Sequence, residues 1–328
     1  MKTLKISFEN YMPCEEIKKE PFYHILSQYY NIEIHDKTSE DVDLIMCTPI
    51  ENWRSIYNIA DYFGIIKTLC INFENTYPDF NAYDYTTSYY DILPERNMCL
   101  PMYWYFDYKI RHGLIKYDLE PFNNEPNFTN DIFYTKENRL GFVSSNAFRD
   151  GLDILYTLFE NFDCKLGGSF INNEYVGPDY VDKIKFLSTC KFTLVFENAN
   201  NDGYVSEKIY DAYLANTVPI YFGSKEVCKD FNPSSYIHVL DYLNIDDLIA
   251  YIQFLMNNEE EYMKILNAKR IINPIDYDKQ ITDFMINVIE NGKIYNHIFG
   301  NIMWYGYGKI LEDKISKQVY LNFRRFTE

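Results

Sequence analysis

The sequence lacks long apolar runs and clustered metal ligands. None of its apolar stretches reaches the roughly 18 residues that a membrane-spanning helix needs. Its N-terminal segment has no long apolar core, because Glu9 and Asn10 interrupt it, so no signal peptide is predicted. Five His are present, and no two of them have metal-ligand spacing on one helix. We therefore expect a cytoplasmic protein without a transmembrane segment.

Cysteine pairs are also missing. The seven Cys are odd in number, lie far apart and form no CxxC motif. This pattern favours reduced thiols over a disulfide framework or a zinc site. Without a secretory signal, the glycosylation sequon Asn127-Phe128-Thr129 is interpreted as a chance match.

Basic residues are scarce. Lys and Arg number 31 against 48 Asp and Glu, so the formal net charge is −17. Nucleic-acid binding by the chain as a whole is not expected, because phosphate backbones are bound through clustered Lys and Arg. Any anionic ligand must instead be held by a few local cations and by backbone N–H groups.

The chain is long enough for a sizeable core and is rich in aromatic residues. With 328 residues, of which 47% are hydrophobic, about two domains are expected. Aromatic residues make up 18% and include 32 Tyr, which argues against a disordered chain. The Tyr excess has two interpretations, namely aromatic faces that stack on sugar rings, or coding bias.

Short apolar runs alternate with amphipathic stretches along the chain. In the first part this predicts a helix at 22–30 and strands at 4–8, 32–35, 42–47 and 65–73. The polar residues 113–138, with two Pro, are interpreted as a connector. The later elements are a turn at 165–169, strands at 140–144, 192–196 and 218–222, and helices at 150–162, 180–188, 207–215, 245–257, 259–270 and largely across 280–328. The alternation predicts an α/β fold with two Rossmann-like domains, whose ligands lie at the carboxyl ends of strands.

Residues 191–224, KFTLVFENANNDGYVSEKIYDAYLANTVPIYFGS, carry the strongest chemical signal. A predicted strand ends at Glu197, a polar loop follows, and Ser206-Glu207-Lys208 opens a helix. A helix start at the carboxyl edge of a strand presents N–H groups to an anion, and Lys208 adds a full charge. The residues alone leave a second interpretation open, in which Ser206 is an ordinary N-cap followed by ordinary first-turn charges.

This segment resembles the donor-binding motif of the α1,3/4-fucosyltransferases, the family 10 glycosyltransferases. The shared elements, in order, are Phe196-Glu197-Asn198, Tyr204-Val205-Ser206-Glu207-Lys208, and Val218-Pro219-Ile220 with Gly223. The following Lys229-Asp230-Phe231-Asn232-Pro233 is similar to bacterial members, in particular those of Helicobacter. Other segments that are similar to the family's are Phe73-Glu74-Asn75, residues 100–104, and residues 142–146 with Arg149.

The resemblance implies residue roles. Glu74 is expected to be the general base. The donor is expected to be bound by Asn146, Arg149, Glu197, Asn198, Tyr204, Val205, Ser206, Glu207 and Lys208. Of these, Arg149 and Lys208 would stabilise the leaving diphosphate, and Glu197 could offset an oxocarbenium-like transition state. The alternatives are a loop carboxylate for Glu74, a solvated residue at a helix start for Arg149 and a structural strand-end carboxylate for Glu197.

The resemblance also implies a fold and an activity. The fold would be α/β with two facing Rossmann-like domains, the GT-B type, in which residues 1–125 bind the acceptor and 126–290 bind GDP-fucose. Residues 291–328 would form a helical segment that packs back on the first domain. The activity would be inverting α1,3 transfer of L-fucose from GDP-fucose to the GlcNAc of an N-acetyllactosamine-type acceptor, as in Lewis-type glycans. GDP-fucose is then a co-substrate and no cofactor is required, a divalent metal being stimulatory at most.

Several alternatives stay open at this stage. The DxD motifs Asp41-Val42-Asp43 and Asp276-Tyr277-Asp278 are interpreted as surface charge in an acidic chain rather than as metal ligands. The basic-aromatic end, residues 320–326, is interpreted as part of a closing helix, with peripheral membrane contact as the second interpretation. The function could also be that of another sugar-nucleotide-dependent transferase of this fold, or of a non-catalytic glycan-binding protein.

Overall fold

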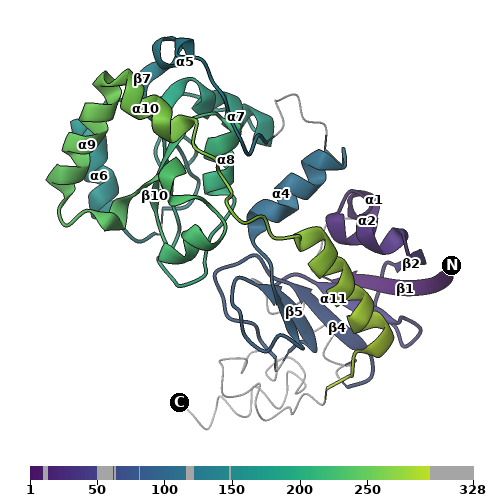
Figure 1. Cartoon of the computed structure of the whole chain (residues 1–328). Coiled ribbons are helices and arrows are strands. Elements are labelled where there is room, and N and C mark those ends of the chain that lie inside the picture. The colour runs from purple at the N-terminus through teal and green to yellow at the C-terminus, as the bar shows by residue number, and fades with distance from the viewer. Residues whose placement is uncertain are drawn as a thin grey trace, which may run out of the picture. The chain divides into compact units, whose positions relative to one another are not determined.

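The chain divides into two compact units. The computed structural model describes residues 1–9, 14–49, 62, 64–80, 82–115, 122–147 and 149–295. The first unit contains Met1–Leu100 and the chain from Tyr277 onward, and the second contains Pro101–Asp276 (Figure 1). This division differs from the boundaries expected after residues 125 and 290. Helix α4 (Met102–Arg111) belongs to the second unit, and helix α11 (Tyr277–Asn291) belongs to the first.

The first unit is built on a parallel sheet of six strands in the order β2-β1-β3-β4-β5-β6. Its strands are β1 (Lys2–Glu9), β2 (Tyr30–His35), β3 (Leu44–Cys47), β4 (Lys67–Ile71), β5 (Tyr85–Ser88) and β6 (Asn97–Cys99). All four residues of β3 and of β5 are buried, as is typical of parallel strands covered on both faces. Helices α1 (Cys14–Ile17) and α2 (Pro21–Ser27) connect β1 to β2.

Helix α11 returns to the first unit and is fastened there by polar contacts. The amine of Lys67 donates to the carbonyls of Val288 at 2.5 Å and Ile289 at 3.0 Å, near the C-terminal end of the helix. Beyond the helix, the N–H of Tyr295 donates to a carboxylate oxygen of Asp84 at 2.8 Å. The helix also packs against α2, which Figure 1 shows beside it. The helix predicted from residue 280 onward is thus confirmed as far as Asn291. Residues 296–328, which include the basic-aromatic end, lie outside the described residues.

The second unit has a parallel sheet of five strands in the order β8-β7-β9-β10-β11. They are β7 (Glu137–Val143), β8 (Cys164–Gly167), β9 (Cys190–Phe196), β10 (Val218–Phe222) and β11 (Ile237–His238). Counted within each unit, both sheets begin with the order 2-1-3-4-5 that doubly wound nucleotide-binding folds use. The predicted α/β fold with two Rossmann-like domains is confirmed.

Helices cover the second sheet. They are α5 (Asp131–Thr135), α6 (Leu152–Asn161), α7 (Tyr180–Ser188), α8 (Lys208–Leu214), α9 (Ile245–Asn257) and α10 (Glu259–Leu266), with short 3-10 turns η1 (Lys225–Lys229), η2 (Pro233–Ser235) and η3 (Val239–Asp241). Helices α7 and α9 occupy the predicted residues 180–188 and 245–257. The amphipathic pattern predicted these two helices correctly because one face of each helix packs into the core.

Two predictions in this unit were wrong. Residues 165–169, expected as a turn, begin inside β8, and only Gly168 and Ser169 leave the strand. The Gly pair suggested a turn, but Gly167 is a buried strand residue, and Gly168 is needed for a close approach. It has φ +100°, and a Cβ there would lie 2.2 Å from the backbone oxygen of Ser144. The expected connector at 113–138 contains α5 and the start of β7.

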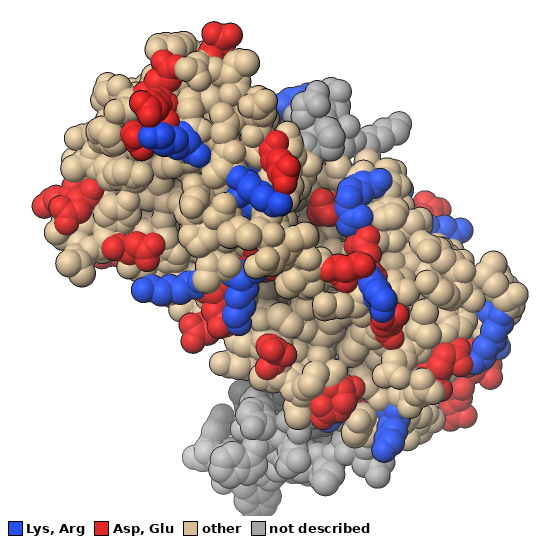
Figure 2. Space-filling view, in the orientation of Figure 1, with Lys and Arg blue, Asp and Glu red and all other residues tan. Residues whose placement is uncertain are grey.

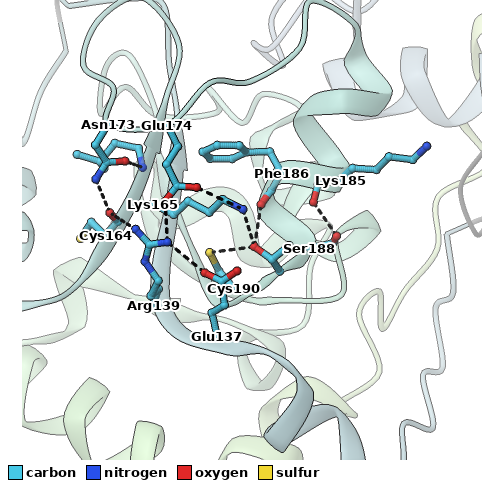
Figure 3. Close-up of polar contacts among 12 residues, drawn as sticks. Glu137, Arg139, Cys164, Lys165, Asn173, Glu174, Lys185, Phe186, Ser188 and Cys190 are labelled. Carbon is cyan, nitrogen blue, oxygen red and sulfur yellow. Dashed lines mark hydrogen bonds and ion pairs between the residues drawn. The ribbon is translucent and has the colours of Figure 1, made fainter.

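The amino end of β7 is pinned by the Arg139 guanidinium. It donates to the carboxylates of Glu174 at 2.7 Å and Glu137 at 3.1 Å, and to the carbonyl of Cys164 at 3.0 Å. Figure 3 shows these groups surrounding the guanidinium. The contacts tie the chain after β8 to β7, at the opposite end of the strand from the loops that follow the carboxyl edge.

The described surface offers no broad cationic face on the side that Figure 2 shows. Acidic and basic side chains are interspersed there, separated by uncharged residues. None of the helices within the described ranges combines the length and the apolar character that crossing a bilayer requires.

Lys136 joins the ends of two helices in the second unit. Its amine donates to the carbonyl of Ser188, the last residue of α7, and to that of Ala215, just after α8, at 3.2 Å. Burial lowers the pKa of Lys136 to about 8, from its ordinary value of 10.5. Helix C-terminal carbonyls favour a cation, but at this site the cost of desolvating the charge is larger.

The contribution of Lys136 to the stability of the protein should therefore rise between about pH 8 and pH 10.5. In this range the unfolded chain keeps the Lys136 proton and the folded chain releases it, so raising the pH favours folding. We expect this residue to contribute on the order of 2 kcal/mol of added stability across the range. Urea unfolding at pH 7.5 and 10 would measure it as the difference between the wild type and Lys136→Met. Lys185→Met, at an exposed position of α7, should follow the wild type. An identical pH dependence in the wild type and Lys136→Met would contradict the prediction.

Candidate active site

Two neighbouring strands of the second sheet end in polar loops at the point where the strand order reverses. Strands β7 and β9 are neighbours in the sheet. After β7 the chain continues to β8 on one side, and after β9 it continues to β10 on the other side, so the loops after β7 and β9 diverge. Arg149 and Asn146 follow β7, whereas Glu197 and Asn198 follow β9. Open parallel sheets bind ligands at this edge. The fold therefore brings four of the predicted donor-binding residues to one end of the sheet.

Glu197 lies at the centre of this edge. Its side chain is 0% exposed. It accepts hydrogen bonds from the N–H of Ser206 at 2.8 Å, the Ser206 hydroxyl at 2.6 Å and the Lys208 amine at 2.9 Å. Gly223, after β10, leaves room for it, since a Cβ there would lie 2.8 Å from Glu197 Cγ. We call Glu197, Ser206 and Lys208 the Glu197 cluster.

The Glu197 cluster changes what can be expected of Glu197. A fully buried carboxylate with three protein donors is already satisfied, which favours the structural alternative for this residue over contact with a sugar. Its effect on a ligand would be indirect, through the position of the Lys208 amine.

The start of α8 also differs from the expectation. The helix begins at Lys208, after Glu207 as N-cap, and has seven residues. The N–H of Ser206 is bonded to Glu197, and that of Lys208 lies 3.4 Å from the Ser206 hydroxyl oxygen. These two N–H groups are therefore used within the protein. The Lys208 amine adds a full positive charge at the start of the helix.

Glu207 and Lys208 are half-buried and both remain ionised. Burial alone would raise the pKa of Glu207, but the charges of Lys208 and Lys183 outweigh it and hold the pKa below its ordinary value. Burial alone would lower the pKa of Lys208, but Glu197 and Glu207 outweigh it and raise the pKa. The edge thus carries a fixed cation beside a fixed carboxylate.

Arg149 supplies a second cation at the same edge. Its guanidinium is 8% exposed and donates to the carbonyls of Phe196, at 3.3 Å, and Asn146, and to the Ser144 hydroxyl. Its buried Nε has no hydrogen-bond partner among the described residues. Burial lowers the pKa of Arg149, but a guanidinium keeps its proton at neutral pH. Arg149 and Lys208 line one small cavity of the second unit.

The remaining predicted donor residues occupy the surrounding loops. Asn146 is exposed, and Asn198 is half-buried with its carbonyl accepting from the N–H of Asp150 at 3.3 Å. Tyr204 and Val205 are 4% exposed each. Their burial indicates that they shape the loop before α8, so any contact of Tyr204 with a nucleotide stays a prediction.

Glu74 lies in the other unit, in the turn that follows β4. Its side chain is exposed, and its N–H donates to the Asn72 side-chain oxygen at 2.8 Å. The Asn72 side chain also bonds to Thr76, so the turn is held from inside. The strand-end placement expected for Glu74 is thus observed, three residues after β4.

An ion pair between α7 and α8 was not predicted from the sequence. Lys183 on α7 and Asp211 on α8 form a buried ion pair at 2.5 Å. The two residues are 28 positions apart, and a charged pair at that separation carries no local signal. Within the described ranges, no three His, Cys, Asp or Glu side chains are grouped to hold a metal ion.

Known proteins resemble this chain in sequence. A family model described as glycosyltransferase family 10 (fucosyltransferase), C-terminal part, matches residues 141–291, which include every predicted donor-binding residue. The α-(1,3)-fucosyltransferase FucT of Helicobacter pylori is 31% identical, in an alignment that covers 89% of this chain and 67% of that one. The human 4-galactosyl-N-acetylglucosaminide 3-α-L-fucosyltransferase 9 is 34% identical over 31% of this chain and 27% of its own length.

Solved structures resemble the chain over most of its length. A crystal structure of an α1,3-fucosyltransferase with GDP has a TM-score of 0.72 and 28% identity, and the match covers 90% of this chain and 93% of that one. A crystal structure of an α1,3-fucosyltransferase with GDP-fucose has a TM-score of 0.71, with the same identity and coverage.

Replacing the central carboxylate should destabilise the second unit. Glu197→Gln keeps the shape of the side chain but leaves the Lys208 ammonium half-buried without its counter-charge. We expect a loss of about 3 kcal/mol in the free energy of unfolding. Asp202→Asn, at an exposed position in the same loop, is the matched control and should stay within about 0.5 kcal/mol of the wild type. Urea unfolding measures both, and equal midpoints for Glu197→Gln and the wild type would show that the cluster does not hold the loop.

Proposed function

The chain belongs to glycosyltransferase family 10, the fucosyltransferases, and from this we propose that it transfers L-fucose from GDP-fucose to an acceptor sugar in an α1,3 linkage. We further propose that the acceptor is the GlcNAc of an N-acetyllactosamine-type glycan, that the anomeric carbon is inverted, and that the product is a Lewis-type structure. In this scheme the second unit binds the donor and the first unit binds the acceptor.

The observation that carries the proposal is the pair of cations at the carboxyl edge of the second sheet. In a chain with a net charge of −17, Arg149 is bonded to the carbonyl of Phe196 and Lys208 to the carboxylate of the next residue, Glu197. Two fixed cations at one strand end are the groups that could meet the charge of a diphosphate. The similar structures bound to GDP and to GDP-fucose support a guanosine diphosphate sugar as the donor.

The chemistry assigns each charged group a task. The acceptor oxygen forms a bond to the anomeric carbon of fucose while the bond from that carbon to the β-phosphate oxygen breaks. The acceptor proton moves to the Glu74 carboxylate, and GDP leaves with the bonding electrons. Arg149 and Lys208 offset the charge that grows on the leaving phosphate. To Glu207, which its neighbours keep ionised, we assign the acceptance of hydrogen bonds from donor hydroxyls.

These assignments leave no task that requires a cofactor. The Arg149 and Lys208 charges meet the charge of the leaving diphosphate, so we propose that a divalent metal is at most stimulatory. No disulfide joins any two of Cys47, Cys70, Cys99, Cys164, Cys190 and Cys228, which supports a reducing compartment such as the cytoplasm.

The turn that carries Glu74 also presents an aromatic ring. Tyr77 is 70% exposed and stacks on Tyr90 with ring centroids 4.0 Å apart. The hydroxyl of Tyr90 in turn donates to the Asn75 side chain at 3.3 Å. A ring fixed in this way offers an apolar surface to the C–H face of a sugar, three residues from the proposed base. This supports placing the acceptor on the first unit.

The direct test is turnover. The protein should convert GDP-fucose and N-acetyllactosamine into GDP and a trisaccharide, which mass spectrometry and linkage analysis identify as the α1,3 product. UDP-galactose in place of GDP-fucose should give no product. A protein that forms no fucosylated product and binds no GDP in calorimetry would overturn the proposal. Donor binding without turnover on any acceptor would favour a non-catalytic glycan-binding protein.

Removing the proposed base should separate catalysis from donor binding. Glu74→Gln should lower kcat by at least about a hundredfold, because the acceptor hydroxyl loses its proton acceptor. The dissociation constant for GDP-fucose, measured by calorimetry, should not change, since Glu74 belongs to the other unit. Glu95→Gln, an exposed carboxylate in the same unit, is the control and should keep full activity. Normal turnover in Glu74→Gln would remove Glu74 as the base.

A further inference from the structure

A second ion pair, between a buried carboxylate and a half-buried amine, lies one helical turn beyond Lys208. Asp211 on α8 is 1% exposed, and its carboxylate accepts from the Lys183 amine on α7 at 2.5 Å. The hydroxyl of Tyr180, the first residue of α7, donates to the other carboxylate oxygen. The pair therefore joins α7 to α8 through a buried ionic contact.

Lys183 also belongs to the surroundings of the donor-binding residues. It lines the same small cavity as Arg149 and Lys208, with Asp211 on the cavity wall beside it. Along the chain, Asp211 follows Lys208 by three positions and Glu207 by four, a spacing that places them on one side of the helix start. Lys183 is thus the cation that α7 contributes to the turn carrying Glu207 and Lys208.

We propose that Lys183, held by Asp211, is a positioning residue of the donor site that keeps Glu207 and Lys208 placed and ionised for binding the sugar nucleotide. The inference rests on the proposed function and extends it to a residue that touches the donor only through its neighbours.

The charges around Glu207 balance only when Lys183 is counted. They come from α7, α8, β9 and the loop after β7, and comprise three carboxylates and three cations, namely Glu197, Glu207 and Asp211 with Arg149, Lys183 and Lys208. Burial alone would raise the pKa of Glu207, and Lys208 and Lys183 together reverse that effect. Without Lys183, carboxylates outnumber cations in a buried region, and protonation of Glu207 becomes easier.

As a link between α7 and α8, the Lys183–Asp211 pair has no advantage over an apolar contact. The cost of desolvating two charges offsets most of their attraction, and two well-packed apolar residues would join α7 to α8 equally well. Apolar residues cannot supply positive charge toward Glu207. The same reasoning explains why Lys183 itself keeps its proton, since burial would lower its pKa but Asp211 and Glu207 raise it.

The experiment measures the affinity for GDP-fucose as a function of pH. Calorimetry on the full chain between pH 4.5 and 8 compares the wild type, Lys183→Met, the charge-preserving Lys183→Arg and the double variant Lys183→Met/Asp211→Asn. Lys185→Met changes an exposed Lys of the same helix and is the matched control. Circular dichroism confirms that each variant is folded at each pH.

Lys183→Met should bind GDP-fucose about tenfold more weakly at pH 7, and the acid limb of binding should move to higher pH by about one unit. The direction follows because removing the cation raises the pKa of Glu207 and also that of Asp211, which burial already raises. Lys183→Arg should restore the acid limb to its wild-type position, which a loss of packing alone would not predict. Lys185→Met should match the wild type throughout.

Several outcomes would overturn the inference. Wild-type affinity and an unmoved acid limb in Lys183→Met would do so while leaving the proposed function intact. The double variant removes one charge of each sign and keeps the balance, so its acid limb should stay near the wild-type position. If Lys183→Met does not fold, Asp211→Asn takes its place. It removes one carboxylate near Glu207, so the acid limb should move to lower pH, and an unmoved or raised acid limb in Asp211→Asn would overturn the inference. A wild-type protein that binds neither GDP nor GDP-fucose would overturn this inference and the proposed function together.

Discussion

One buried carboxylate organises the second unit of this protein. Glu197 directly follows the central strand β9 and, with no exposure, accepts from the Ser206 backbone, the Ser206 hydroxyl and the Lys208 amine. A buried carboxylate is stable only when its oxygens are satisfied, so the loop between β9 and α8 must close onto it. That closure sets where α8 begins and where the Lys208 amine lies. The position of the cation therefore depends on a carboxylate whose oxygens are already bonded within the protein.

The second constraint is the parallel sheet around which this cluster forms. The strand order places the loops after β7 and β9 at the point where the chain changes direction, and polar side chains can gather there without breaking the core. Arg149 comes from one loop and Glu197 from the other. Lys183 and Asp211 extend the same charged region into α7 and α8. An acidic chain can thus hold a local group of cations because each has a carboxylate or a carbonyl beside it.

Much of the fold followed from local pattern. The strands at residues 192–196 and 218–222 and the helices at 180–188 and 245–257 were predicted, because buried parallel strands and amphipathic helices leave a strong periodic signal. Strand β8 was missed because its Gly-rich end resembles a turn. The return of α11 to the first unit was placed at the wrong residues, because it depends on contacts such as that of Lys67 with the Val288 carbonyl, which join distant parts of the chain.

The sequence by itself indicated the family to which the chain belongs and predicted which residues carry the chemistry, because the run from Phe196 to Gly223 keeps its motif in one continuous segment. The net charge of −17 also indicated that any anionic ligand must be bound by a few local cations. Only the tertiary structure decided what each charge does. Burial and hydrogen bonding turned Glu197 into a support for Lys208 rather than a group facing a sugar, and packing of α7 against α8 brought Lys183 to Asp211. Burial and pairing depend on the whole fold, and no local stretch of sequence contains them.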